Sequence, residues 1–456
     1  MYNFKKQINF LDNKEIFLLF LSFIFSCVII VVEMVGISTI PILIINFLDF
    51  KQTVFNNVIL KFLGSIDLKD LIIFICLLFF LKSLFTYSHA IFDFYIFKRL
   101  RISVGKKVYN NLLQKSYLEN IESPSSTKIW LINNSAIFVK LIQTYLNLFR
   151  SIIFIVAVSS IILFINFKYF IYFFIFLIIF LGTFYYFLSK KIKQFGKNYL
   201  ILARNLDKVI LETFEGFKNI IIYNKFKFFS KFFANTISKK ENNLQSSNFI
   251  SQMPQHFVEF LGVLFLCIFV LISLQNNTDQ GNFIYILGLI SYGSVRILSF
   301  LKLSISSLNI LKEKNFVVDV ICNELNLQSK ESSFKYSLLN QSNVYDEKNQ
   351  NIISIQNLSY KYPNSDKYII RNQNLSIKKN SFYIIRGESG QGKSTFLDIL
   401  MGILEPTNGK VKLNLKNNNI GYVSQECFIF NDTTKNNIAI GLNQNQIDEI
   451  KVNKIL

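Results

Sequence analysis

The chain has few residues of the types that carry metal, redox or histidine chemistry. Its 456 residues include 2 His, 5 Cys, 5 Pro and 1 Trp. The cysteines lie far apart and form no Cys-x-x-Cys pair, which argues against a disulfide framework and against a zinc site. The two histidines, His89 and His256, leave little basis for histidine-based catalysis.

Acidic residues are also scarce, because 29 Asp and Glu stand against 49 Lys and Arg, for a formal net charge of +20. A basic excess points either to nucleic acid or to the inner surface of an anionic membrane. Apolar residues make up 51% of the chain and include 50 Phe. This composition excludes intrinsic disorder. It also favours a membrane partner over nucleic acid.

Six apolar runs are long enough to cross a bilayer, which takes about 20 residues. They cover residues 16–48, 71–97, 141–165, 169–188, 249–274 and 283–303. Lys and Arg gather in the connections 98–128 and 190–240 and are sparse in the other loops. The positive-inside rule then predicts that these two connections and both termini are cytoplasmic. Residues 1–320 are expected to form an all-α, six-helix membrane bundle.

The basic connections keep a helical spacing of apolar residues, as at Leu206, Ile210 and Phe214. This pattern predicts helices that continue beyond the bilayer and turn back through short cross-helices in the cytoplasm. An amphipathic helix lying on the inner leaflet is the alternative interpretation.

The composition changes after the sixth apolar run. Residues 321–352 are expected to be a linker, because 328–351 is rich in Ser, Asn, Gln and charged residues. Residues 353–456 then predict a soluble α/β domain. Short apolar runs typical of strands lie at 351–360, 382–386, 410–415 and 419–425.

The chemistry of this domain lies in the segment GESGQGKST, which satisfies the pattern G-x-x-x-x-G-K-[ST] between an apolar run and a helical run. Glycines let backbone N–H groups surround a phosphate, and the following helix adds its positive N-terminal end. Lys393 supplies a charge at the β and γ phosphates, and the Ser394 hydroxyl can ligate Mg²⁺. The predicted nucleotide-binding residues here are Gly387, Glu388, Ser389, Gly390, Gln391, Gly392, Lys393, Ser394 and Thr395.

With six spans ahead of it, the segment 353–441 resembles the nucleotide-binding domain of ATP-binding-cassette (ABC) exporters. LSYKYP is similar to the adenine-stacking loop of that family, which implies that Tyr362 stacks on the base. GYVSQECFIFNDTTKNNIAIG is similar to the Q-loop, which implies that Gln425 senses Mg²⁺. The resemblance implies ATP and Mg²⁺ as ligands and a homodimer of half-transporters that sandwiches two ATP molecules.

Within the exporters, the sequence is most similar to flippases of lipid-linked oligosaccharides used in bacterial protein glycosylation. The resemblance rests on VVEMVGISTIPILI, MPQHFVEFLG and FNDTTKNNI. It implies a multi-pass protein of the bacterial cytoplasmic membrane that moves a lipid-linked saccharide or a similar amphiphile. Exporters of drugs, peptides or other lipids remain alternatives.

The sequence departs from the family pattern after Gln425. It contains no LSGGQ signature, no apolar strand that ends in Asp-Glu and no switch histidine, so no catalytic residue can be assigned. We therefore expect an incomplete, C-terminally truncated P-loop domain, with Ile384 and Val423 partly unprotected and no ATPase activity above background. The alternative function is a catalytically silent, truncated or split-gene membrane protein that binds nucleotide and needs a partner chain for hydrolysis.

Four charged residues fall within the predicted spans, where a charge is costly and usually pairs or faces water. Glu33 and Lys82 are expected near mid-bilayer, either as a pair or facing a cavity, with a direct substrate role as the other interpretation. Arg150 and Arg296 either snorkel to the interface or present a cation to an anionic head group. The small residues around Arg296 predict that it points into the bundle.

Overall fold

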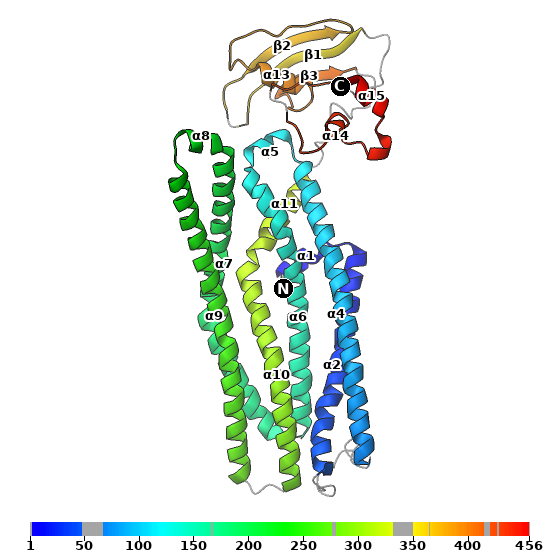
Figure 1. The fold of residues 1–456 in the computed structure, drawn as a ribbon, viewed down its shortest axis with the longest axis vertical. Helices are drawn as coiled ribbons and strands as arrows, with labels where there is room; N and C mark the ends of the chain where they lie inside the picture. Colours follow the sequence, from blue (N-terminus) through cyan, green and yellow to red (C-terminus); the bar gives the residue numbers. More distant parts are fainter. Residues whose placement is uncertain are drawn as a thin grey trace. The chain divides into compact units, whose positions relative to one another are not determined.

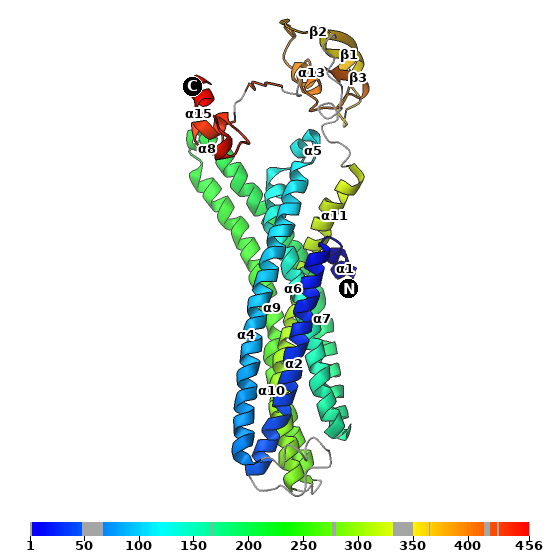
Figure 2. The same cartoon turned by 90° about the vertical axis from the view of Figure 1, so that its right-hand side faces the viewer.

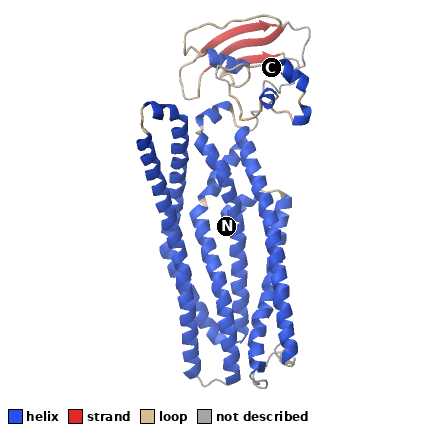
Figure 3. Cartoon of the chain, in the orientation of Figure 1, coloured by secondary structure: helices blue, strands red, loops and turns tan. Residues whose placement is uncertain are grey.

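The chain divides into two compact units, Met1–Ser333 and Phe334–Leu456, which we describe separately. The computed structural model describes residues 2–47, 67–165, 167–275, 280–331, 350–363, 365–414, 420–425 and 428–455. The described part of the first unit is helical, and the second contains a β-sheet (Figure 3).

Six long helices run side by side along the first unit (Figure 1). They are α2 (Asn13–Phe47), α4 (Leu68–Leu113), α6 (Ser125–Ile165), α7 (Phe167–Glu215), α9 (Phe226–Gln275) and α10 (Gln280–Lys314). Apart from residue 48, each predicted apolar run falls inside one of them.

Four of the described helical segments are long and apolar enough to cross a membrane. These segments are Asn13–Ile44, Leu68–Leu113, Ser125–Ser160 and Ser291–Lys314. They contain or overlap the first, second, third and sixth predicted runs. Most side chains of the fourth and fifth runs, 169–188 and 249–274, lie outside the described residues, so these two spans remain predictions.

Helices α4, α7 and α9 extend well beyond the apolar runs. The short helix α5 (Tyr117–Glu122) follows α4, and α8 (Phe217–Ile222) lies between α7 and α9. Helix α5 begins with a capping box, in which Ser116 and Glu119 bond to each other's backbone N–H groups. Gly216 precedes α8, and Asn224 follows it with a φ of +48°. Both short helices lie at the same end of the bundle (Figures 1 and 2). The structure thus has long helices joined by short ones, as predicted, and the position of the short helices in the cytoplasm remains a prediction.

The main apolar core of this unit forms where α4 and α6 meet α11 (Phe316–Glu331), close to α1 (Tyr2–Ile8). Phe138, Val318, Ile321 and Cys322 are fully buried there. The predicted linker 321–352 is therefore wrong at its start, because residues 321–331 belong to α11. The apolar residues at 317, 318, 321 and 322 share one helix face, and burying that face favours a helix over a linker. Residues 332–349 lie outside the described residues.

The second unit contains a three-stranded antiparallel sheet in the order β2–β1–β3. The strands are β1 (Asn351–Tyr360), β2 (Ile370–Lys378) and β3 (Asn408–Leu413), and Ile355 lies opposite both Leu375 and Val411. Strand β1 confirms the prediction at 351–360, and β3 confirms most of that at 410–415. The described part of this unit also contains the short helices α13 (Lys393–Leu400), α14 (Thr434–Ile438) and α15 (Glu449–Ile455) and the 3-10 turn η2 (Gln444–Gln446).

Two of the predicted strands, at 382–386 and 419–425, are wrong for the residues that the structure describes. A strand needs a neighbouring strand, and in the described part of the second unit neither segment joins the sheet β2–β1–β3. Their apolar side chains are consequently open to solvent, with Phe382 and Val423 each 89% exposed and Ile384 62% exposed. The expectation that Ile384 and Val423 are unprotected is confirmed.

Candidate functional site

The segment 387–394 folds into a loop that leads directly into α13. Gly390 and Gly392 adopt φ values of +83° and +87°, in the left-handed region that only glycine enters freely. A Cβ on Gly392 would also lie 2.2 Å from the Cγ2 atom of Ile369. These two constraints explain why the loop has glycine at these positions. They place the N-terminus of α13 at the loop, where backbone N–H groups attract an anion.

Lys393 is the first residue of α13, and its ammonium group folds back over the loop. The Nζ atom donates to the carbonyl oxygens of Gly387 at 2.8 Å and of Glu388 at 2.7 Å. The Gln391 side chain closes the same loop by accepting a hydrogen bond from the Glu388 backbone N–H. The lysine charge is therefore held at the mouth of the loop, which suits a phosphate group.

Tyr362 lies just after β1, and its hydroxyl is 3.1 Å from the hydroxyl of Thr395 in the first turn of α13. Its ring packs edge-on against Tyr360, with the ring centroids 5.2 Å apart. Thr395 is only 7% exposed. The fold thus brings an aromatic side chain from a distant part of the sequence to the phosphate-type loop.

Ser394 and Gln425, the two predicted Mg²⁺ ligands, are both exposed. The hydroxyl of Ser394 is a hard oxygen donor at the start of α13, which is the kind of ligand that Mg²⁺ prefers. Gln425 lies in a segment without regular secondary structure, and the bonds described for the loop involve other residues. The structure therefore brings Tyr362 to the loop, whereas the meeting of Ser394 with Gln425 remains a prediction.

In the bundle, the predicted pairing of Glu33 with Lys82 is confirmed. The Lys82 ammonium on α4 lies 2.9 Å from Oε1 of Glu33 on α2. The Nε atom of Arg296 on α10 lies 3.3 Å from the same carboxylate oxygen. The prediction that Arg296 points into the bundle is thereby confirmed. These three residues are called the Glu33 cluster below.

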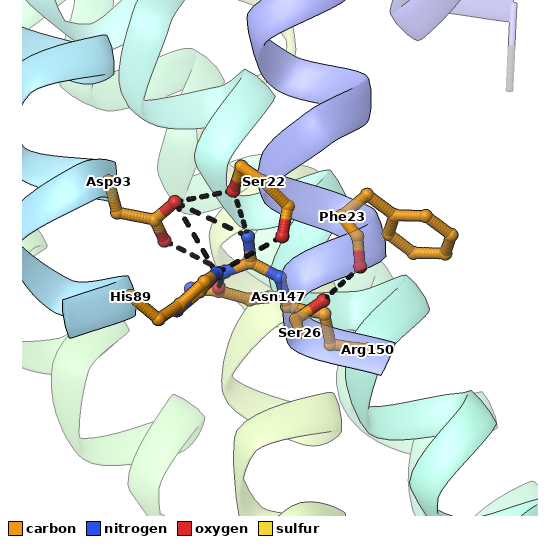
Figure 4. Close-up of polar contacts among 7 residues, drawn as sticks. All are labelled: Ser22, Phe23, Ser26, His89, Asp93, Asn147 and Arg150. Carbon is orange, nitrogen blue, oxygen red and sulfur yellow. Dashed lines mark hydrogen bonds and ion pairs between the residues drawn. The ribbon is translucent and has the colours of Figure 1, made fainter. Parts of the chain in front are cut away.

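Arg150 belongs to a second buried cluster, which joins α2, α4 and α6 (Figure 4). Its guanidinium donates to Asp93 at 2.9 Å and to the Ser22 hydroxyl at 2.6 Å. Ser22 donates in turn to Asp93, and His89 lies 3.1 Å from the Ser22 carbonyl. Arg150 is therefore engaged inside the protein, and neither snorkelling nor an unpartnered cavity cation describes it. We call these residues the Asp93 cluster.

Reasoning from sequence missed the Asp93 cluster, although it gave Arg150. The available signal is Asp93 itself, because an aspartate inside the predicted span 71–97 needs a cation. His89 lies one helical turn before it on α4, with its Nε2 atom 3.7 Å from Asp93. The partner on α6 could not be chosen from sequence, since helix order and rotation are tertiary properties.

Comparison with known proteins shows a similarity between the second unit and a protein family. Residues 370–455 match the family model described as ABC transporter. The match contains the loop 387–394 and α13, and the helical unit lies outside it. Together with the loop geometry, this match identifies residues 370–455 as an ABC transporter ATP-binding domain.

Individual relatives match over a similarly short stretch. An ABC transporter ATP-binding/permease protein of Haemophilus influenzae is 36% identical over 84 residues, which is 16% of this chain and 15% of that protein. An export ATP-binding/permease protein of Rickettsia prowazekii is 34% identical over 90 residues, or 18% of this chain and 15% of that protein. A molybdate/tungstate import ATP-binding protein of Pyrococcus abyssi is 33% identical over 87 residues, which is 17% of this chain and 25% of that protein.

The matches thus span well under a third of each of these relatives. Because one of these relatives is named as an import protein and another as an export protein, the similarity of the ATP-binding domain does not by itself separate the two transport directions. The relatives from Haemophilus influenzae and Rickettsia prowazekii are named as proteins that combine ATP binding with a permease or export role.

Proposed function

We propose that this protein is an ATP-driven exporter subunit that works as a dimer of two copies. One observation carries the proposal: the loop around Lys393 is in the same chain as a bundle of helices long and apolar enough to cross a membrane. The names of two relatives, which combine ATP binding with permease or export roles, support the same function. ATP binding in one unit would then drive rearrangement of the helices in the other.

The nucleotide contacts follow from the geometry of the loop. The loop and Lys393 hold the phosphates, and Tyr362 lies close enough to Thr395 to present its ring to the adenine base. Mg²⁺, held by Ser394 and Gln425, would neutralise phosphate charge.

The transported substrate is proposed to be a lipid-linked saccharide or a similar amphiphile. The support is the resemblance of the membrane segments, together with the Glu33 cluster, which places cations within the spans. Arg150 is a weaker contact for cargo than Arg296, because Asp93 and Ser22 already occupy its guanidinium. The basic loops favour the bacterial cytoplasmic membrane with both termini in the cytoplasm.

We also propose that further polypeptide completes the ATP-binding domain. The support is the exposure of Phe382, Ile384 and Val423 in segments without regular secondary structure, which is the state expected for strands that await a partner. This observation favours the alternative in which the polypeptide 1–456 binds nucleotide but depends on another chain segment for hydrolysis.

A reconstituted flipping assay tests the transport function. The protein, together with the polypeptide that completes its ATP-binding domain, would be placed in vesicles that contain a fluorescent lipid-linked saccharide. We expect ATP-dependent movement of the lipid between leaflets, and loss of that movement in Lys393→Ala. If lipid-linked saccharides stay in place while another amphiphile moves with ATP, the substrate assignment is wrong. If nothing moves, exporter function is wrong.

A further inference from the structure

The Glu33 cluster contains more positive than negative charge. Two cations, Lys82 and Arg296, share the single carboxylate of Glu33, whose side chain is only 7% exposed. No second carboxylate joins this cluster among the residues that the structure describes. An uncompensated cation within a membrane span is costly, so an anion bound at the cluster would offset the excess positive charge.

The two cations differ in how firmly they are held. Lys82 is on α4, its side chain is 14% exposed, and it is the closer of the two to Glu33. One turn from Glu33, a Cβ on Gly36 would lie 3.3 Å from the Phe79 ring, so α2 and α4 pack closely beside this pair. Lys82 and Glu33 therefore belong to one tightly packed helix pair.

Arg296 comes from a different helix and is more accessible, with its side chain 35% exposed. It has a second partner on its own helix, because its Nη2 atom donates to the Tyr292 hydroxyl at 3.2 Å. Its guanidinium also lies 5.5 Å from the centroid of the Tyr292 ring. Arg296 can leave Glu33 without losing every partner, and Glu33 would still be paired with Lys82.

We propose that Lys82 is the resident counter-ion of Glu33 and that Arg296 is an exchangeable one, which binds an anionic group of the phosphate class. When the anion takes Arg296, the ion pair between α2 and α10 breaks while Glu33 stays neutralised. Binding of an anionic head group is thereby coupled to separation of these helices. The proposal rests on the proposed function only in taking an amphiphile as the ligand, and it requires no ATP.

The Asp93 cluster shows the opposite arrangement. If Arg150 left Asp93, its one described alternative acceptor on its own helix would be Asn147, at 3.5 Å. The Arg150 side chain is 11% exposed. Breaking the ion pair between Arg150 and Asp93 would leave buried charges with poor compensation. This pair therefore forms a stable link between α4 and α6.

Distance measurements on the full chain in dodecyl maltoside test the proposal. Nitroxide labels would be placed at Val31→Cys on α2 and Val295→Cys on α10, two positions that are 60% and 59% exposed, in a background with the five native cysteines replaced. The probe is dodecyl phosphate. We expect it to lengthen or broaden the distance distribution between the labels, whereas additional neutral detergent should not.

Three variants distinguish the roles of the cations. Arg296→Met should show the broad distribution without dodecyl phosphate and should not respond to it. Lys82→Met should keep the short, narrow distance distribution in the presence of dodecyl phosphate, because Glu33 then retains Arg296 as its counter-ion. Lys312→Met, which removes a charge from the same helix α10, should respond like the unmodified protein.

An unchanged distribution in the unmodified protein, or a full response in Arg296→Met, would overturn the proposal. A full response in Lys82→Met would refute the role of the resident counter-ion. These outcomes are independent of the flipping assay, since the measurement contains neither ATP nor a transported saccharide.

Discussion

At the scale of single residues, the side chains that are suited to bind phosphate form hydrogen bonds with other groups of the protein. Lys393 is held by two carbonyl oxygens of its own loop, and the Thr395 hydroxyl is held by Tyr362. A nucleotide must replace these contacts with its phosphate oxygens. A charged phosphate oxygen is a stronger acceptor for the Lys393 ammonium than a neutral carbonyl oxygen, so the exchange is favourable.

Asp398 on α13 gives a prediction about pH. Burial raises the pKa of its carboxyl above the usual 3.8. A raised folded-state pKa means that the protonated form is favoured in the folded domain, so this contribution to stability is present below the unfolded-state pKa and is lost as pH rises through the folded-state pKa. Asp398→Asn should therefore stabilise the ATP-binding unit at pH 7, and the gain should vanish below about pH 4.

Urea-dependent pulse proteolysis of the second unit, performed on the full chain at both pH values, measures this gain. Asp366→Asn at an exposed position is the matched control and should change the urea midpoint little. A gain for Asp398→Asn that is equally large at both pH values would contradict the burial account.

The residues of the nucleotide loop could be predicted from sequence because their chemistry is local. The spacing of Gly387, Gly392, Lys393 and Ser394 defines a loop and a helix start within one continuous segment. Asp93 could not be paired with Arg150 in the same way, because the two are on different helices and 57 positions apart. The role of Gln425 stays a prediction for a related reason, since its position depends on how a segment without regular secondary structure packs.

At the scale of elements, the two charged clusters predict unequal effects of matched substitutions. Arg150→Met leaves Asp93 buried beside a largely neutral neighbourhood and should cost about 3 kcal/mol or more of stability. Arg296→Met leaves Glu33 paired with Lys82 and should cost about 1 kcal/mol or less. Thermal unfolding midpoints of the two purified variants in detergent compare them directly.

The comparison includes its own control, because each variant removes one arginine from a membrane helix and replaces it with the same residue. If Arg296→Met lowered the midpoint as far as Arg150→Met, the ranking of the two ion pairs would be wrong. The double variant Asp93→Arg and Arg150→Asp restores the ion pair with the two charges exchanged, and it should recover part of the lost thermal unfolding midpoint.

The long helices were predictable, whereas two predicted strands do not form in the described residues and one observed strand, β2, was not predicted. Each helix satisfies its hydrogen bonds within itself, so an apolar run of sufficient length predicts it from local sequence. A strand requires a neighbouring strand, and in the described part of the second unit neither 382–386 nor 420–425 joins the sheet. In contrast, β2 was missed because its sequence, IRNQNLSIK, is mostly polar, and only pairing with β1 makes it a strand.

At the scale of the whole molecule, protease sensitivity should differ between the two units. The segments that contain Phe382 and Val423 are exposed and have no regular secondary structure, and such segments are readily cleaved. Chymotrypsin should cut within 382–386 or 420–430 before it cuts the described parts of α4 and α6. Mass spectrometry of the fragments after brief digestion in detergent identifies the sites, and first cuts inside α4 or α6 would contradict this ranking.

The central claim is that the membrane bundle and a nucleotide site built around Lys393 belong to one working protein. Photolabelling of membranes that contain the full chain with an azido-ATP analogue tests it most directly. We predict labelling of the unmodified chain that excess ATP prevents. We also predict loss of labelling in Lys393→Ala and retention in Lys410→Ala, which removes an exposed lysine from β3. Labelling that is equally strong in Lys393→Ala would contradict the account.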